Sequence, residues 1–163
     1  MRIAVGSDEK SYLTEAVLGD LHKRGLETEL YGALHPSGLE NLWPEVGRNV
    51  GERVASGSCK EGILFCWTGT GVSIAANKVP GIRAALCIDG PTAAGAKRWN
   101  HANILVISLR ITSPQVAQEI LDAWFSTPYG KGEDAKCVAL VSDMEQSFSN
   151  TCAQPEENTR FMS

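Results

Sequence analysis

One stretch of the sequence, residues 62–78, combines a buried strand, a glycine loop and the start of a helix. Gly62–Cys66 is an apolar run of strand length, Trp67–Gly71 is the loop, and Val72–Lys78 has the apolar spacing of a helix. N–H groups in the first turn of a helix have no partner inside it, so such a turn is suited to an anion. Because Cys66 is the last residue of the strand, the sequence places a thiol beside that anion site.

Strand and helix patterns alternate along the whole chain. The expected strands are residues 2–6, 27–31, 62–66, 81–88 and 103–108. The expected helices are residues 9–24, 45–55, 72–79, 92–99, 133–148 and one that starts at Ser113-Pro114. Alternation of this kind predicts an α/β fold, a five-stranded parallel sheet with helices on both faces. We expect one domain over residues 1–149 and a polar C-terminal tail over residues 150–163.

The carboxyl ends of the strands are the expected location of the functional site, because ligands of parallel α/β sheets bind there. Four segments are expected at this edge: residues 7–9, 66–71, 89–90 and 108–110. We expect Asn100 and His101, which end a helix, at the same edge. Structural alternatives remain open: Asp8 as a helix N-cap, Asn100 as a C-cap, Arg110 in a surface ion pair, and the glycine loop as a turn that binds nothing.

Composition excludes several classes of protein. With 163 residues and a formal charge of −4, the chain has no basic patch for nucleic acid or for a membrane surface. No apolar run approaches the roughly 20 residues of a membrane span. The five cysteines and three histidines lack metal-ligand spacing, so we expect no metal site. No signal-peptide pattern precedes the first strand, and this favours a cytoplasmic protein with reduced thiols.

Cys66 has two interpretations. A free cysteine is most often a small buried core residue. A thiol at a strand end beside a helix N-terminus, however, has its thiolate stabilised, which is the setting of reactive cysteines. The loop is not a dinucleotide fingerprint, because residue 74 is Ile, and it is not a P-loop, because no Gly-Lys-Ser/Thr follows. We therefore favour a reactive thiol.

These residues resemble the ribose-5-phosphate isomerase B family, which includes the galactose-6-phosphate isomerase subunits. The resemblance covers most of residues 2–145, and its strongest part reads Cys66-x-Thr68-Gly69-x-Gly71-x-x-Ile74-Ala75-Ala76-Asn77-Lys78-x-x-Gly81-Ile82-Arg83-Ala84. Further matches are Ser7-Asp8, Trp43-Pro44, Asn100-x-x-Asn103-Ile104-Leu105 and Arg110.

The resemblance implies a Rossmann-like three-layer domain that dimerises, with each site built partly by the neighbouring subunit. It also implies interconversion of an aldose and a ketose through an enediolate, without metal or cofactor. Cys66 would move the proton between C1 and C2, and amides of Gly69, Thr70 and Gly71 would hold the oxyanion. Asp8 and Asn100 would bind sugar hydroxyls. Thr68 would support ring opening or the enediolate.

The chain departs from the family pattern at several functional positions. Glu9 and Trp99 stand where the family usually has histidines, and Trp67 replaces a glycine of the loop. Glu133 and Cys137 stand where the family carries the two arginines that grip phosphate. A carboxylate in place of a bidentate cation repels a dianion.

These departures set the remaining expectations about the site. Glu9, Trp67 and Arg110 are expected to contact substrate, Trp99 to stack on a sugar ring, and His101 to take over ring opening.

Two hypotheses follow. In the first, the protein is an aldose–ketose isomerase that acts on a sugar phosphate or a related sugar, with Cys66 as base. It functions as a homodimer or as a dimer of dimers, without nucleic-acid or membrane partners. In the second, it is a catalytically silent sugar-binding or partner subunit of the same family.

Overall fold

A computed structural model describes residues 1–38 and 42–152, with side chains described through Phe148. Five strands form one sheet in the order β2-β1-β3-β5-β4, and every neighbouring pair is parallel. The strands are β1 (Arg2–Ser7), β2 (Glu27–Gly32), β3 (Glu61–Cys66), β4 (Ala84–Leu86) and β5 (Ile104–Ser108). The expected α/β fold with a five-stranded parallel sheet is confirmed.

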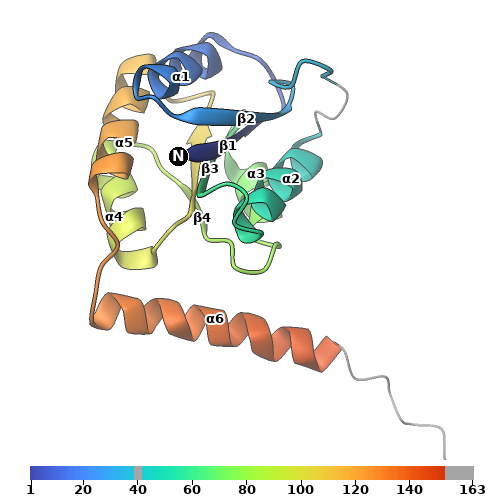
Figure 1. Cartoon of the computed structure of the whole chain (residues 1–163), viewed down its shortest axis with the longest axis vertical. Coiled ribbons are helices and arrows are strands. Elements are labelled where there is room, and N and C mark those ends of the chain that lie inside the picture. The colour runs from blue at the N-terminus through green and yellow to red at the C-terminus, as the bar shows by residue number, and fades with distance from the viewer. Residues whose placement is uncertain (39–41, 153–163) are drawn as a thin grey trace, which may run out of the picture.

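Helices cover both faces of the sheet, giving three layers (Figure 1). They are α1 (Tyr12–Lys23), α2 (Trp43–Ala55), α3 (Thr70–Ala76), α4 (Gly90–Asn100), α5 (Pro114–Ser126) and α6 (Glu133–Cys152). Helices α1, α4 and α5 pack on one face, with Val17 and Ile120 in that core. Helices α2 and α3 pack on the other face, through Val50 and Val72. Every residue of β3 and β5 is buried, as expected of central strands covered on both sides.

Helix α1 begins three residues later than the sequence pattern predicts. Ser11 is its N-cap and exchanges hydrogen bonds with Thr14 in a capping box, in which the Ser11 side chain accepts from the Thr14 amide at 3.2 Å. Asp8 therefore is not the helix cap. Its carboxylate remains available at the end of β1.

Strand β4 is shorter than predicted, with three residues in place of the eight of 81–88. Two asparagine side chains form hydrogen bonds with the backbone of residues 81–84, much as a neighbouring strand would. The Asn77 carboxamide accepts from Ala84 N at 2.8 Å and donates to Ala84 O at 2.9 Å. Asn103 accepts from Arg83 N at 2.8 Å and donates to Gly81 O at 2.9 Å. Side chains thus take over pairing that the sequence pattern assigned to a longer strand.

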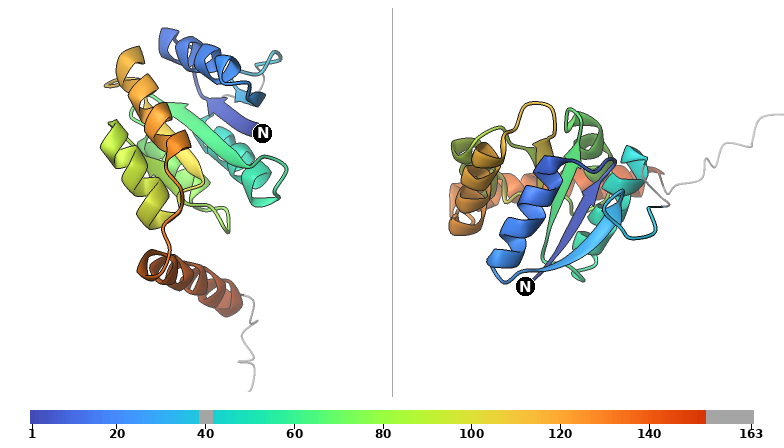
Figure 2. Two further views of the ribbon diagram at one scale, coloured as in Figure 1. Left: turned by 60° about the vertical axis from the view of Figure 1, so that its left-hand side comes forward. Right: turned by 90° about the horizontal axis from the view of Figure 1, so that it is seen from above.

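Helix α6 lies across one end of the body, where it contacts α4 (Figures 1 and 2). It runs to Cys152, four residues beyond the predicted end at Phe148, so residues 150–152, which were assigned to the polar tail, are helical. The rest of the predicted tail, residues 153–163, lies outside the described residues. Within residues 1–38 and 42–152, no helix is long and apolar enough to span a membrane. The cytoplasmic location stays a prediction.

Candidate active site

The sheet topology places the ends of β1 and β3 side by side at a switch point. The chain runs from β1 to β2 on one side and to β3 on the other, and in open α/β sheets ligands bind where the order reverses. Ser7 pairs with Phe65 in the register of the two strands. The next residues along each strand are Asp8 and Cys66. The fold therefore brings these two predicted site residues together.

Cys66 is the last residue of β3 and is buried, with its thiol directed toward Asp8. The Cys66 Sγ donates to Asp8 Oδ2 at 3.2 Å. Backbone amides of Trp67 and Gly69 also interact with the sulfur and favour its anionic form. The sulfur thus interacts with one carboxylate and two amide donors.

The expected stabilisation of the thiolate is only part of what the structure shows. Burial, followed by the hydrogen bond from the thiol to Asp8 and by the carboxylate charge, raises the pKa of Cys66 above its usual value. The amides of Gly69 and Trp67 act in the predicted direction, but they are outweighed. The expectation of a lowered thiol pKa was therefore wrong for the protein without ligand.

The glycine loop between β3 and α3 has a backbone that other residues cannot adopt easily. Gly69 has φ of 78°, and a Cβ there would lie 2.6 Å from Leu86 Cδ1. The hydroxyls of Thr68 and Thr70 lie 2.8 Å apart. Neighbouring β5 supports the loop, because Ser108 Oγ donates to the carbonyl of Trp67 at 2.9 Å. The amides of residues 69–71 are thus held in place next to Cys66.

Glu9 and Arg110 flank this loop at the same edge of the sheet. The carbonyl of Glu9 accepts from Ser7 Oγ at 2.6 Å, which fixes the turn after β1. The amide of Arg110 donates to the carbonyl of Trp67 at 3.0 Å. Both side chains are exposed. The structure therefore brings Asp8, Glu9, the loop and Arg110 to one edge, as predicted.

Two tryptophans border the loop, and sequence reasoning treated only one as part of the site. Trp67 is 55% exposed. Trp43, at the start of α2, packs against the loop backbone, because a Cβ at Gly71 would lie 3.0 Å from Trp43 Cδ2. The sequence feature that could have indicated this role is the Trp43-Pro44 pair, which marks the start of a helix. In the structure this helix start lies against Gly71. Trp43 adds an aromatic wall that the sequence analysis did not assign to the site.

Trp99, Asn100 and His101 lie at the opposite edge of the sheet from Cys66, contrary to expectation. Helix α4 begins at the carboxyl edge, where Asp89 is its N-cap, and runs back toward the amino end of β5. The carbonyl of His101 accepts from Arg83 Nε at 3.0 Å, just before β4. Within one chain these three residues therefore cannot join the Cys66 site.

His101 is held firmly at this amino edge. It has a left-handed φ of 47° as the C-cap of α4, and its ring stacks on Tyr129 with centroids 4.8 Å apart. His101 Nε2 lies 2.9 Å from the carbonyl oxygen of Gly130. Because a carbonyl only accepts, Nε2 carries the proton and Nδ1 is the basic nitrogen of the neutral ring.

A hollow of about 530 Å³ at the amino edge separates α6 from the body. Trp99 and Asn100 line it together with Cys137, Val138 and Val141 of α6. Two predicted substrate contacts thus share an apolar hollow of their own, remote from the thiol in the same chain.

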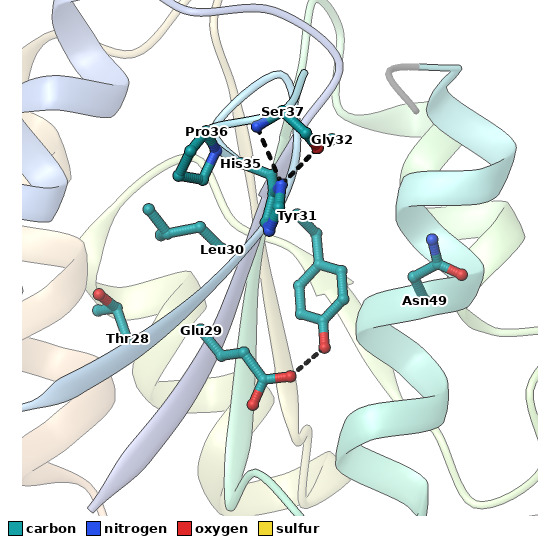
Figure 3. A pocket seen from close by; sticks show the side chains of 9 residues that line it. All are labelled: Thr28, Glu29, Leu30, Tyr31, Gly32, His35, Pro36, Ser37 and Asn49. Carbon is teal, nitrogen blue, oxygen red and sulfur yellow. Dashed lines mark hydrogen bonds between the residues drawn. The ribbon is translucent and has the colours of Figure 1, made fainter. Parts of the chain in front are cut away.

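A second hollow, of about 610 Å³, opens along β2 (Figure 3). Tyr31 lies between β2 and Asn49 of α2 and donates a hydrogen bond to Glu29, while His35 Nδ1 lies 2.6 Å from Ser37 Oγ. None of the predicted site residues lines this hollow.

Comparisons with known proteins agree on the class of enzyme. The family model described as Ribose/Galactose Isomerase matches residues 3–141. D-erythrulose-4-phosphate isomerase of Pectobacterium atrosepticum is 33% identical over 146 residues, which cover 89% of this chain and 95% of that protein. Ribose-5-phosphate isomerase B of Escherichia coli is 34% identical over 146 residues, which cover 89% and 97%. The structure of ribose-5-phosphate isomerase B of Clostridium thermocellum matches with a TM-score of 0.84 at 38% identity, over 91% of this chain and 99% of that one.

The fold and these relatives define a sugar isomerase of the aldose–ketose type. The chain belongs to the Ribose/Galactose Isomerase family. The resemblance found in the sequence is therefore confirmed, and the particular sugar is left open.

Proposed function

We propose that the protein isomerises a sugar phosphate or a related sugar through an enediolate, with Cys66 as the base. The observation that carries the proposal is the position of the Cys66 sulfur at the β1/β3 switch point, beside the amides of a fixed glycine loop. The thiolate takes the proton from one of the two carbons C1 and C2 and returns it to the other. Amides of residues 69–71 stabilise the oxyanion, and a donor of this kind is typically worth about 3 kcal/mol.

Substrate hydroxyls have a place to bind at Asp8. Its Oδ1 is buried and has no hydrogen-bond donor among the described residues. A buried acceptor without a donor is unfavourable, so a ligand hydroxyl is the natural partner. Thr68, a residue of the loop, is placed to support the enediolate.

A second copy of the chain completes the site in this proposal. Trp99, Asn100 and His101 cannot reach the Cys66 of their own chain, so they serve the site of a partner. Exposed apolar side chains of α6 at four-residue spacing, Leu140, Met144 and Phe148, offer a contact surface. We therefore propose a homodimer with two composite sites.

Hybrid dimers test this arrangement. Cys66→Ala and Asn100→Ala each inactivate both sites of a homodimer, but a mixed dimer contains one site with neither change. Unfolding and refolding an equal mixture should recover about a quarter of wild-type activity, since half of the dimers are mixed and one of their two sites is intact. No recovery from a mixture that refolds completely would contradict the composite site.

For the substrate we propose a sugar phosphate that reacts in its open-chain form. The positions where the family carries histidines hold Glu9 and Trp99, which suits a substrate with no ring to open. D-erythrulose 4-phosphate is such a molecule, because its terminal oxygen is esterified and cannot close a ring. For a cyclic sugar, Nδ1 of the partner's His101 is the group proposed for ring opening. Arg110 beside the loop and Lys131 and Lys136 near the start of α6 are cations available for the phosphate.

The test of the reaction is proton exchange at carbon. Wild-type protein in deuterated water should place deuterium on C1 or C2 of D-erythrulose 4-phosphate or of a broader panel of sugars, as read by NMR. Cys66→Ala should lower the rate by about 10²–10⁴, the usual contribution of a positioned base. Cys59→Ala, which removes another buried cysteine, should stay close to wild type.

The alternative is a catalytically silent sugar-binding or partner subunit. The raised pKa of Cys66 and the carboxylate at Glu133 favour it. Wild-type protein that exchanges no faster than Cys66→Ala on the whole panel, while still binding one of the sugars by calorimetry, would establish this alternative.

A further inference from the structure

We propose that Cys66 is a ligand-gated base: Asp8 holds it as a thiol in the empty site, and a hydroxyl donor that binds Asp8 releases it as a thiolate. This inference rests on the proposed isomerase site and adds a regulation of its thiol. The gate consists of Asp8 and Cys66 together with the amides of Trp67 and Gly69.

The hydrogen bond between Cys66 Sγ and Asp8 Oδ2 favours the thiol. It spans 3.2 Å, and loss of the proton would leave two anionic groups at that separation in a partly buried position. Like charges at such a distance disfavour ionisation strongly. Asp8 thus keeps the proton on the sulfur for as long as its carboxylate lacks another donor.

The amides of the glycine loop favour the thiolate. Those of Trp67 and Gly69 interact with Sγ, and they are fixed because the loop is tied to β5 through Ser108. The two influences therefore oppose each other at one atom. In the empty site, burial and Asp8 prevail, and the pKa of Cys66 is raised.

The second oxygen of Asp8 provides the means of switching. Asp8 Oδ1 is buried without a donor among the described residues. A ligand hydroxyl that donates there draws the negative charge of the carboxylate away from the sulfur, since hydrogen bonds to a carboxylate stabilise its charge. The hold on the thiol weakens, and the amides then favour the thiolate. The proton released from Sγ passes to solvent water.

Asp8 is the charged group whose field acts on Cys66 among the described residues. From β5, the register partner of Cys66 is Ser108, which is uncharged. The loop after β3 presents Thr68, also uncharged, and the α2–α3 side of the core packs apolar residues around Cys66. Glu9 and Arg110 at the same edge are also charged, but their side chains are exposed and therefore screened by solvent. A change of charge at Asp8 therefore acts most strongly on Cys66.

The gate is measured by titrating the ultraviolet absorbance of the thiolate, with Cys66→Ser subtracted as a blank. In Asp8→Asn, which keeps the shape and loses the charge, the apparent pKa of Cys66 should fall by about one unit or more, a tenfold rise in its ionisation constant. Glu9→Gln loses the same charge one residue away and should shift the apparent pKa of Cys66 by less than about a third of that amount. If Asp8→Asn does not fold, Asp8→Ser makes the same test.

A polyol completes the experiment, and ribitol 5-phosphate is the probe because it offers hydroxyls but has no carbonyl to isomerise. Ribitol 5-phosphate should lower the pKa of Cys66 in wild type and leave the pKa of Cys66 in Asp8→Asn unchanged. The proposal would be overturned if the apparent pKa of Cys66 in Asp8→Asn is equal to or above that of wild type. It would also be overturned if Glu9→Gln lowers this pKa as much as Asp8→Asn does. An equal effect of the probe on Asp8→Asn would overturn it too.

This titration involves no turnover. A protein that shows the gate but exchanges no carbon-bound hydrogen would retain this inference and lose the proposed reaction. A protein that isomerises with an ungated thiol would do the reverse.

Discussion

The two ends of β3 treat a buried ionisable side chain in opposite ways. Glu61 begins the strand and Cys66 ends it, and both residues are 7% exposed. Glu61 has an ion pair with Lys97 and accepts from Trp124 Nε1 at 2.6 Å, so both of its oxygens are partnered. Cys66 has one carboxylate partner, and that carboxylate has an oxygen without a donor.

The difference teaches that burial alone does not mark a functional group. The amino end of β3 is closed: the Lys97 ammonium also lies 4.5 Å from the centroid of the Trp124 ring and 4.8 Å from that of Tyr129. Nothing there is left for a ligand to satisfy. The carboxyl end is incomplete in the one atom that a substrate hydroxyl would reach. We therefore assign the amino end to stability and the carboxyl end to chemistry.

The largest expected effect comes from removing the Glu61 carboxylate at the amino end of β3. Glu61→Ala leaves the Lys97 ammonium buried and unpaired, which should cost about 3–5 kcal/mol of the free energy of unfolding. Urea denaturation measures it. Activity per folded molecule should stay near that of wild type.

The double variant Glu61→Leu/Lys97→Met is the control, because replacing a whole buried pair by apolar residues is often close to neutral. If Glu61→Ala lowers the free energy of unfolding by less than about 1 kcal/mol, or inactivates the protein without unfolding it, the assignment of the amino end of β3 to stability would be wrong.

Gly69→Ala tests the role of the glycine loop at the carboxyl end of β3. A Cβ there would lie 2.6 Å from Leu86 Cδ1, and φ of 78° disfavours any side chain, so the loop amides must shift. Loss of one oxyanion donor typically costs about 10²–10³ in kcat, and backbone strain costs about 1–3 kcal/mol of stability. Initial rates on the best sugar of the panel measure the first effect.

Gly57→Ala is a matched control for Gly69→Ala, since φ is 74° and a Cβ would meet open space. It should show the backbone strain without the loss of rate. Equal rates in the two alanine variants would remove the loop from the chemistry.

The pH dependence of kcat/KM sharpens the comparison further. A raised pKa means that Cys66 in the free protein is mostly a thiol at neutral pH. The reactive thiolate fraction then rises tenfold per pH unit, so kcat/KM should climb with a slope near one up to and beyond the ordinary thiol value of about 8.5. A profile already flat at neutral pH would show that the thiol is ionised before substrate binds.

His101→Asn should have the smallest effect. Asparagine tolerates the left-handed backbone at this position but loses the stack on Tyr129 and the contact with Gly130. We expect a loss of about 1 kcal/mol of stability. We also expect about a tenfold fall in rate with cyclic ribose 5-phosphate, which is less than the 10²–10⁴ usual for a positioned acid or base.

D-erythrulose 4-phosphate, which has no ring to open, is the control substrate for His101→Asn. Its rate should be unchanged. An equal fall with both substrates would assign His101 to subunit contact and not to ring opening.

Much of this organisation could be predicted from the sequence, and the exceptions have physical reasons. Apolar runs and turn residues located all five strands, and the rule that ligands bind at the carboxyl ends of parallel strands placed Cys66 and the loop at that edge. The bond from Cys66 to Asp8 depends on the register of β1 against β3, which no local pattern encodes. Asn100 was placed at the wrong edge, although a helix that connects parallel strands must run back to the amino edge. The raised pKa of the thiol follows from burial, which a motif does not reveal.

The asparagine pairs beside β4 have a consequence for the protein in concentrated solution. β4 is one of the two outer strands of the sheet, and an uncovered outer strand invites another chain to extend it. The carboxamide of Asn77 offers Ala84 one donor and one acceptor and then ends. It occupies the backbone groups of Ala84 without providing a further row of peptide groups on which strands could add. Asn77 thus opposes the addition of a strand from another molecule at this position.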